Sequence, residues 1–168
     1  LIRKKYEDFG SCGQYVNLQI LTNNLYGIDL DEQAIEIARL NLLVASLEER
    51  MKLPNLTNIK KANSLTIDWQ EMFSDVFKQG GFDVIIGNPP YIKEDINKKA
   101  FENLHESPYY QGKMDLWTMF ACISIDKLKE GGVLSFIAPS SWISNAGASI
   151  MRNKILTDGE LKTFIDFG

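Results

Sequence analysis

The tetrapeptide Asn88-Pro89-Pro90-Tyr91 contains the side chains of this sequence that are best suited to chemistry. Two successive prolines remove two backbone donors and restrict φ, so the chain there is stiff and its carbonyl groups cannot join a strand ladder. The Asn88 amide oxygen and the Pro89 carbonyl oxygen could then both accept hydrogen bonds from one exocyclic amine, and the Tyr91 ring could stack on the planar group that bears the amine. Asn and Pro are also common in turns for conformational reasons alone, which is the alternative interpretation.

Asp29 is the second candidate, because it stands near the end of a short apolar run at residues 25–30. A carboxylate at the end of such a strand can accept hydrogen bonds from both hydroxyl groups of a ribose, as in dinucleotide-binding folds. This indicates a cofactor that contains a nucleoside. The alternative is that Asp29 only stabilises the following helix through its dipole, although Asp31 is better placed to cap that helix.

Strands alternate with helices along the chain. Apolar runs predict strands at residues 25–30, 59–65, 82–87, 133–138 and 161–167, of which 82–87 is the strongest. Apolar residues three and four apart predict helices at 34–45, 69–77, 114–128 and 148–156, with Gly131-Gly132 ending the third. This order predicts an α/β fold with a doubly wound, mostly parallel sheet. Ligands of such sheets bind beyond the carboxyl ends of the strands, where Asn88 and Asp29 stand.

Composition excludes several other classes of protein. With 168 residues, 45% hydrophobic and 24% charged, the chain is an ordinary globular domain, and its net charge of −4 excludes a general electrostatic clamp on nucleic acid. Cys12, Cys122 and the single His105 have no metal-site spacing. No apolar run approaches the ~18 residues of a membrane span, and two cysteines form no disulfide framework. We therefore expect a cytoplasmic protein without a metal.

The sequence resembles a known family in five stretches: LYGIDLD (25–31), NSL (63–65), FDVIIGNPPY (82–91), DLW (115–117) and GGVLSFIAPSSW (131–142). They are similar to the S-adenosylmethionine-dependent N6-adenine DNA methyltransferases, especially restriction-modification enzymes with the gamma-class order of motifs. The resemblance implies a Rossmann-like, doubly wound fold. It also implies an adenine-specific DNA methyltransferase of a bacterial restriction-modification or phage-defence system, with S-adenosylmethionine as methyl donor.

The resemblance also implies a role for each matching residue. Asp29 would bind the ribose of the cofactor, Leu30 would pack on its adenine, and Asn63 would bond the adenine edge unless it is an ordinary turn residue. Asn88 and Pro89 would receive the N6 amine of a flipped adenine in double-stranded DNA, within the corner stiffened by Pro90. Tyr91 would stack on the extruded base, because the target nitrogen is unreachable inside a stacked duplex.

Other polar residues carry weaker predictions. Lys93 and Lys113, with Lys98 and Lys99, could contact phosphates of a flipped strand, although solvation alone also explains charges in a loop that contains acidic residues. Ser140 and Trp142 follow another strand and could form the rim of the pocket. Four other residues are expected to have structural roles: Asp115 and Trp117 in the core or as a cap, Cys122 in the core, and His105 in an exposed loop.

Two parts of the expected enzyme are not found in the sequence. The segment FGSCG at residues 9–13 lies near the ~20 residues before Asp29 that a cofactor loop requires, but the charged residues before it are unsuited to a buried strand, so it is better interpreted as a surface turn. We expect residues 1–168 to be one partial catalytic domain with a helical or loop lead-in at 1–24. The glycine-rich loop would then precede Leu1 and the target-recognition domain would follow Gly168. An isolated segment of this kind is expected to bind the cofactor weakly and to be inactive.

Two rival functions stay open. A methyltransferase of the same fold could act on protein glutamine or on RNA adenine, because those enzymes share the tetrapeptide or a close relative of it. The chain could also be a non-catalytic DNA-binding or scaffold fragment. In the favoured interpretation an endonuclease or a specificity region belongs to the same chain or to a partner chain.

Overall fold

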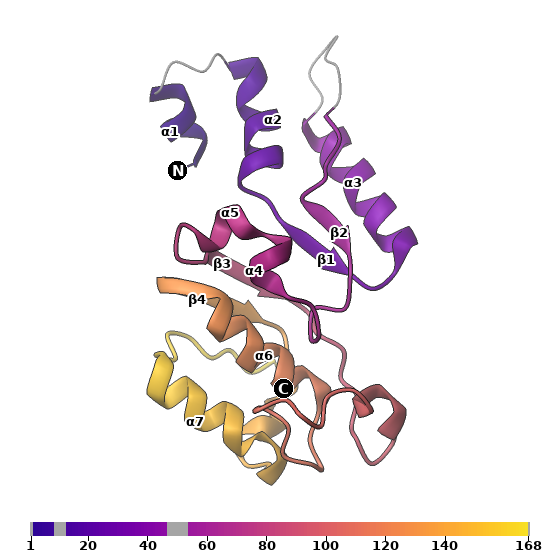
Figure 1. Ribbon diagram of the computed structural model, residues 1–168. Helices are drawn as coiled ribbons and strands as arrows, with labels where there is room; N and C mark the ends of the chain where they lie inside the picture. The colour runs from indigo at the N-terminus through magenta and orange to yellow at the C-terminus, as the bar shows by residue number, and fades with distance from the viewer. Residues whose placement is uncertain (1, 9–12, 47–53, 168) are drawn as a thin grey trace. The chain divides into compact units, whose positions relative to one another are not determined.

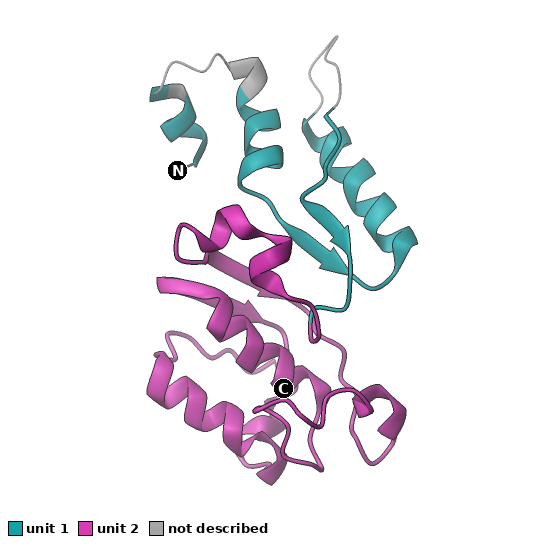
Figure 2. Ribbon diagram, viewed as in Figure 1, with its two compact units in different colours: residues 1–64 teal, residues 65–168 magenta. Residues whose placement is uncertain are grey.

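A computed structural model describes residues 2–8, 13–46 and 54–167, which form two compact units, 1–64 and 65–168 (Figures 1 and 2). Unit 1 contains helices α1 (Ile2–Asp8), α2 (Gly13–Asn23) and α3 (Glu32–Ser46) and strands β1 (Gly27–Asp29) and β2 (Ile59–Lys61). The two strands are parallel, with Gly27 opposite Ile59 and Asp29 opposite Lys61.

A small apolar core holds unit 1 together. Leu21 of α2, Ile35 of α3, Leu56 and Ile59 are its buried members. The buried Asn58 side chain donates hydrogen bonds to the carbonyl groups of Leu21 and Leu25. These bonds satisfy an amide that would otherwise be costly to bury, and they tie the start of β2 to the end of α2.

Unit 2 begins with two short helices and a parallel pair of strands. The helices are α4 (Trp69–Met72) and α5 (Ser74–Phe77), and the strands are β3 (Phe82–Gly87) and β4 (Leu128–Phe136). Between the strands run the 3-10 helix η1 (Lys98–Phe101) and helix α6 (Leu116–Lys127), and after them come η2 (Ser140–Ile143), η3 (Ala146–Ala148) and α7 (Ser149–Asp158). Because β3 and β4 are parallel, their carboxyl ends lie at the same edge of the sheet.

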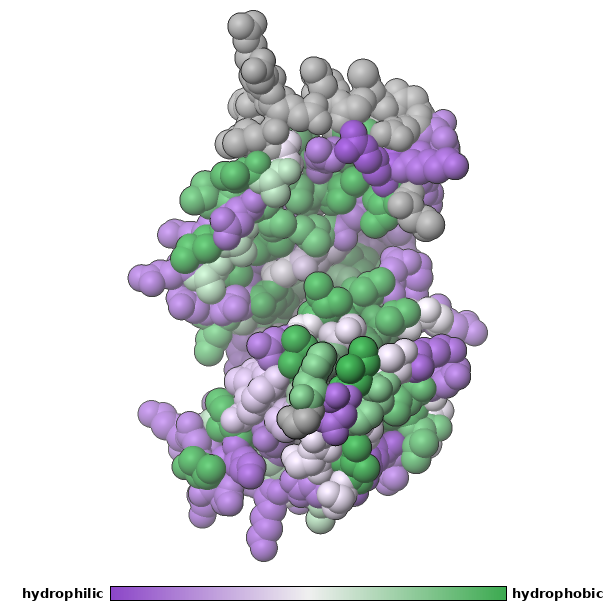
Figure 3. All heavy atoms as spheres, turned by 180° about the vertical axis from the view of Figure 1, so that it is seen from behind, coloured by the Kyte–Doolittle hydropathy of each residue, from purple (hydrophilic) through white to green (hydrophobic). Residues whose placement is uncertain are grey.

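Helix α6 packs into two hydrophobic clusters of unit 2. Met119 packs in a cluster with Phe101, while Trp117 and Cys122 pack in another cluster with Met151 of α7. The Phe82 ring at the start of β3 makes an edge contact with Phe77, with ring centroids 5.8 Å apart. Several large apolar side chains on β3 and β4 stay exposed, among them Val84, Ile86 and Val133. Figure 3 shows hydrophobic side chains beside hydrophilic ones on the rear surface of the molecule.

The predicted order of strands and helices is confirmed in part. The helix predicted at 69–77 is divided into α4 and α5, the strand predicted at 59–65 ends at Lys61, and two other predictions are wrong. Residues 161–167 form no strand; they follow α7 as exposed chain without regular structure. Gly131-Gly132 does not end a helix, because α6 ends at Lys127 and the glycine pair lies inside β4. The described strands form two separate parallel pairs in a mixed α/β structure. A single doubly wound sheet stays a prediction.

Within the described residues, no helix is long and apolar enough to cross a membrane. The same residues contain no group of three or more His, Cys, Asp or Glu side chains that could hold a metal ion.

Candidate functional site

The corner at the end of β3 lies beside the end of β4. Gly87 is the last residue of β3, and its carbonyl accepts a hydrogen bond from the Ile137 backbone N–H at 3.3 Å. A Cβ atom at Gly87 would lie 3.0 Å from the Phe136 ring, so a glycine allows the two strand ends to approach closely. The stretch Asn88-Pro89-Pro90-Tyr91 leaves the sheet from this point, as the sequence predicts.

Tyr91 folds back over this edge of the sheet. Its hydroxyl oxygen lies 2.8 Å from the Asn88 side-chain oxygen, Oδ1, and 2.8 Å from the Ile137 carbonyl oxygen. Pro89 is buried, and within the described residues its carbonyl oxygen accepts no hydrogen bond. Asn88 is exposed. The two oxygens that the sequence assigns to an amine are therefore not consumed by backbone donors, although Asn88 Oδ1 is contacted by a neighbouring side chain.

The chain after Tyr91 is attached to the start of α6. Lys93 pairs with Asp115 in an antiparallel bridge. The Glu94 N–H donates to the Met114 carbonyl at 3.0 Å, and the Leu116 N–H donates to the Ile92 carbonyl at 2.8 Å. These bonds fix the direction in which the diproline corner leaves the sheet.

Glu94 organises the turn that precedes α6. Its carboxylate accepts hydrogen bonds from the Tyr110 hydroxyl and from the Lys113 backbone N–H. The Tyr110 hydrogen bond is the main reason that the pKa of Glu94 lies below its ordinary value. Lys113 itself has φ of 48°, a left-handed conformation that is unusual for a residue with a side chain. Nothing in the sequence indicated this role of Glu94.

Asp115 is the residue directly before α6, the position that a helix cap would occupy. Its side chain makes no capping hydrogen bond. Its Oδ1 atom is buried and has no hydrogen-bond partner among the residues that the structure describes. Burial raises the pKa of Asp115 above its ordinary value, and the facing backbone N–H of Trp117 and the charge of Lys93 offset only part of this shift. Trp117 is buried in the core, as predicted.

Ser140 and Trp142 lie just beyond the end of β4, in η2. Ser140 is exposed, whereas Trp142 is partly buried and contacts the Phe164 ring, with centroids 6.4 Å apart. Arg152 of α7 donates to the carbonyl groups of Trp142 and Asn145 at 2.6 Å each. Both predicted rim residues are thus at the same sheet edge as the diproline corner, and α7 fixes the loop that carries them.

The three residues expected to contact a nucleoside come together in unit 1. Asp29 ends β1, Leu30 follows it, and Asn63 lies two residues beyond β2, at the same edge of the parallel pair. Asp29 Oδ1 accepts from the Asp31 N–H at 2.8 Å, while Oδ2 makes no hydrogen bond within the described residues. Leu30 is 68% exposed. An open carboxylate oxygen therefore stands next in sequence to an exposed apolar side chain.

Asp31 is confirmed as the cap of the following helix. Its Oδ1 atom accepts a hydrogen bond from the Gln33 N–H at 2.9 Å, one residue inside α3. The segment at residues 9–13, which the sequence predicts to be a surface turn, lies outside the described residues except for Gly13, which begins α2.

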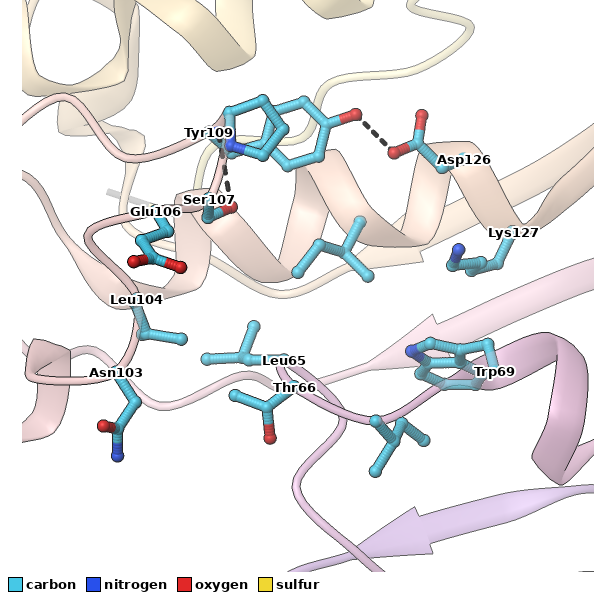
Figure 4. Close-up of a pocket in the computed structure, with 13 residues that line it drawn as sticks. Leu65, Thr66, Trp69, Asn103, Leu104, Glu106, Ser107, Tyr109, Asp126 and Lys127 are labelled. Atoms are coloured by element: carbon cyan, nitrogen blue, oxygen red, sulfur yellow. Dashed lines mark hydrogen bonds between the residues drawn. The ribbon is translucent and has the colours of Figure 1, made fainter.

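A cavity of unit 2 lies elsewhere. Figure 4 shows it between the segment from Leu65 to Trp69, the loop around Ser107 and helix α6, with a volume of about 420 Å³. Its Asp126 carboxylate accepts from the Tyr109 hydroxyl and forms an ion pair with Lys154 at 2.6 Å. None of the predicted site residues lines it. We place the candidate chemistry at the strand ends, because this cavity is open and the Asp126 carboxylate in it is already paired with Lys154.

Comparison with protein families identifies the group to which the sequence is related. The family model described as Eco57I restriction-modification methylase matches residues 23–168. The chain belongs to this family. The match includes the carboxyl ends of all four described strands and every residue of the candidate site.

Individual relatives of this Eco57I family member carry names of the same kind. The chain is 32% identical to the type II restriction enzyme and methyltransferase RM.Eco57I of Escherichia coli, over 91% of the chain and 18% of that protein. It is 29% identical to the type II methyltransferase M.VspI of Vibrio sp. (strain 343), over 86% of the chain and 32% of that protein. It is 24% identical to the modification methylase CviBIII of Paramecium bursaria Chlorella virus NC1A, over 68% of the chain. The chain thus spans a third or less of the first two relatives.

Proposed function

We propose that this chain forms part of the catalytic domain of a DNA methyltransferase that methylates the N6 amine of adenine. The observation that carries the proposal is the exposed Asn88 amide and the unbonded Pro89 carbonyl at the end of β3, next to the ring of Tyr91. Prolines at 89 and 90 bring no backbone N–H to this corner, so the corner is rich in acceptors. A group with two N–H donors complements it.

Asn88 and Pro89 would act on the target nitrogen itself. The lone pair of an aromatic amine is delocalised into the ring, which makes the amine a poor nucleophile. Two acceptors on its N–H bonds favour a pyramidal nitrogen and stabilise the positive charge that develops as the nitrogen lone pair forms the new N–C bond. One amine proton then leaves to solvent, which restores a neutral product. Tyr91 would hold the base by stacking, once the base has left the duplex.

S-adenosylmethionine is the proposed methyl donor, and when bound it supplies a methyl group on a positively charged sulfur that leaves with the C–S electron pair. The open oxygen of Asp29 is suited to its ribose and the exposed Leu30 to one face of its adenine. Asn63 would bond the adenine edge. These assignments concern unit 1 alone.

Lys93, Lys113 and the rim residues are proposed to contact the DNA. Lys93 and Lys113 flank the paired segments that fix the corner, and both are exposed. Ser140 and Trp142 stand beyond the neighbouring strand end. The names of the relatives, which are restriction-modification enzymes, favour double-stranded DNA over protein glutamine or RNA as substrate. By the same argument an endonuclease activity or a specificity region would accompany the methyltransferase.

The test is methylation by the full-length protein that contains this chain. It would be expressed in a host without adenine methylation, and the genomic DNA sequenced for N6-methyladenine. The Asn88→Ala variant is expected to abolish methylation while its circular dichroism spectrum stays unchanged. Asn153→Ala, an exposed position on α7, is the matched control and should methylate normally. Undiminished methylation by Asn88→Ala would overturn the proposal, and so would a wild-type protein that methylates another substrate.

A further inference from the structure

Two oxygen atoms that can accept a hydrogen bond lie beside the Tyr91 hydroxyl, which has only one proton to donate. It lies 2.8 Å from Asn88 Oδ1 and 2.8 Å from the Ile137 carbonyl oxygen. A phenol can donate to only one of these oxygens at a time. The other oxygen then faces the lone pairs of the phenol oxygen at hydrogen-bond distance, which is repulsive.

A half-turn of the Asn88 amide about its Cβ–Cγ bond removes this conflict. The oxygen and nitrogen ends of the amide have nearly the same size, so the turn requires little space. Nδ2 then donates to the phenol oxygen, and the phenol proton goes to the Ile137 carbonyl. Two hydrogen bonds replace one, and Asn88 Oδ1 points away from Tyr91.

We propose that the Tyr91 hydroxyl is a positioning group, which receives a hydrogen bond from Asn88 Nδ2 and so turns Asn88 Oδ1 toward the target amine. The inference rests on the proposed function and adds to it a role for the hydroxyl that is separate from stacking by the ring. With the amide reversed, Asn88 would meet an amine with N–H groups, and donor would face donor.

Two features of the structure make Tyr91 suitable for this role. Asn88 is exposed, and within the described residues its side chain makes its one hydrogen bond with Tyr91, so no other described group orients the amide. The second acceptor is rigid, because the Ile137 N–H is bonded to the Gly87 carbonyl where β3 and β4 end. The hydroxyl therefore links the amide to the sheet itself.

A double-mutant cycle in the full-length protein separates orientation from stacking. Tyr91→Phe keeps the ring and removes the hydroxyl, and it is expected to lower kcat about three- to tenfold, the worth of one neutral hydrogen bond, with KM unchanged. Asn88→Asp replaces the amide with two equivalent oxygens, which need no orientation. In the Asn88→Asp background, Tyr91→Phe is therefore expected to change kcat less than about twofold by the same reasoning.

The controls address the ring and the fold. Extrusion of the target base, followed by the fluorescence of 2-aminopurine at the target position, should be the same for Tyr91→Phe and the wild type. Tyr6→Phe removes another hydroxyl that lies 2.8 Å from an asparagine oxygen, that of Asn24, and should leave kcat unchanged. An equal loss from Tyr91→Phe in both backgrounds, or no loss in the Asn88 background, would overturn the inference.

A spectroscopic measurement covers the case in which Asn88→Asp is too slow to assay. In protein with ¹⁵N-labelled asparagine, the Nδ2 resonance of Asn88 should shift on Tyr91→Phe, because its acceptor is lost. An unmoved resonance would refute the contact. The resonance can be read whether or not the wild type methylates adenine, so failure of the proposed function and failure of this inference give different results.

Discussion

Gly147 offers the sharpest test of how the loop beyond β4 supports the candidate site. It is buried in η3, and its N–H donates to Asn145 Oδ1 at 2.9 Å. A Cβ atom at this position would lie 2.3 Å from the Lys113 carbonyl oxygen and 3.0 Å from Met114 Cα. Both neighbours are backbone atoms, in a turn whose lysine already has φ of 48°. Neither can rotate away, so Gly147→Ala must push η3 from the turn that precedes α6.

The expected cost follows from the severity of this overlap. Overpacking of a buried position costs about 1–3 kcal/mol. In a protein of this size each kcal/mol lowers Tm by about 2–4 °C, which gives a fall of roughly 2–12 °C. The assay is thermal unfolding followed by circular dichroism.

Gly159→Ala is the matched control for Gly147→Ala. Gly159 has an extended backbone with φ of −155°, and a Cβ there would lie 3.5 Å from the Ile155 carbonyl oxygen, an ordinary contact. An exposed substitution of this kind changes stability by less than about 0.5 kcal/mol, so Tm should move by less than about 2 °C. Equal Tm values for the two variants would refute the packing argument, since it depends on the contrast between 2.3 Å and 3.5 Å.

Three further predictions concern single side chains. Because burial raises the pKa of Asp115, the folded protein holds that proton more tightly than the unfolded chain does. In urea titrations, wild-type stability relative to Asp115→Asn should therefore fall as the pH rises above the ordinary pKa of an aspartate, about 4, and a constant difference would contradict this. Burial raises the pKa of the Cys122 thiol to about 12, so in a Cys12→Ser background iodoacetamide should label the protein only after unfolding. Lys113→Gly relieves a left-handed conformation that costs about 1 kcal/mol and should not lower Tm, yet it should weaken DNA binding and reduce its salt dependence, whereas unchanged affinity would exclude a phosphate contact.

The sequence alone predicts the bounds of β3, because every feature that defines this strand lies within it or directly beside it. Residues 82–87 are a β-branched apolar run, and the strand occupies the same six residues. Gly80 and Gly81, with φ of 96° and 121°, form the turn before it. Two prolines that cannot donate to a ladder end it. The predicted and observed strands therefore agree.

The same reasoning was wrong for residues 161–167 because a strand also needs a partner. The segment alternates apolar residues as a strand does, but Ile165 is 65% exposed and Phe167 is 86% exposed. No described strand pairs with it. An apolar pattern indicates which side chains favour burial. It does not indicate whether a neighbouring strand is available for pairing.

The glycine pair at 131–132 was misinterpreted for a related reason. In the β3–β4 pairing, Phe82 lies opposite Leu128 and Val84 opposite Val133, so Asp83 alone corresponds to residues 129–132. Gly131 has φ of 75°, and a Cβ at Gly132 would lie 2.9 Å from the Phe82 carbonyl oxygen. The glycines allow β4 to bulge against β3. A helix stop and a bulge have the same composition, and only the register between two distant segments distinguishes them.

The same distinction applies to the candidate site, where some residues are predictable from nearby sequence and one contact depends on residues far apart in the chain. The sequence predicts Asn88 and Asp29 as site residues because ligands of parallel sheets bind at strand ends, and in the structure Asp29 ends β1 and Asn88 directly follows β3. The contact from Tyr91 to Ile137 spans 46 residues, and no periodicity encodes it. It arises because β3 and β4 are neighbours and end together, which brings the carbonyl of the residue after β4 within reach of the first aromatic side chain after β3.

The diproline corner explains why such a contact matters to the proposed chemistry. Pro89 and Pro90 have no N–H, and the Pro90 carbonyl already accepts the Ile92 N–H at 3.2 Å. The remaining acceptors are the Pro89 carbonyl, whose direction the backbone fixes, and the Asn88 oxygen, whose direction depends on a side-chain rotation. A donor with two N–H bonds needs both directions defined at once. Proline supplies the fixed member, and the adjustable member needs a hydrogen bond that sets its rotation. The Tyr91 hydroxyl, three residues along and anchored to the Ile137 carbonyl at the neighbouring strand end, can supply that hydrogen bond.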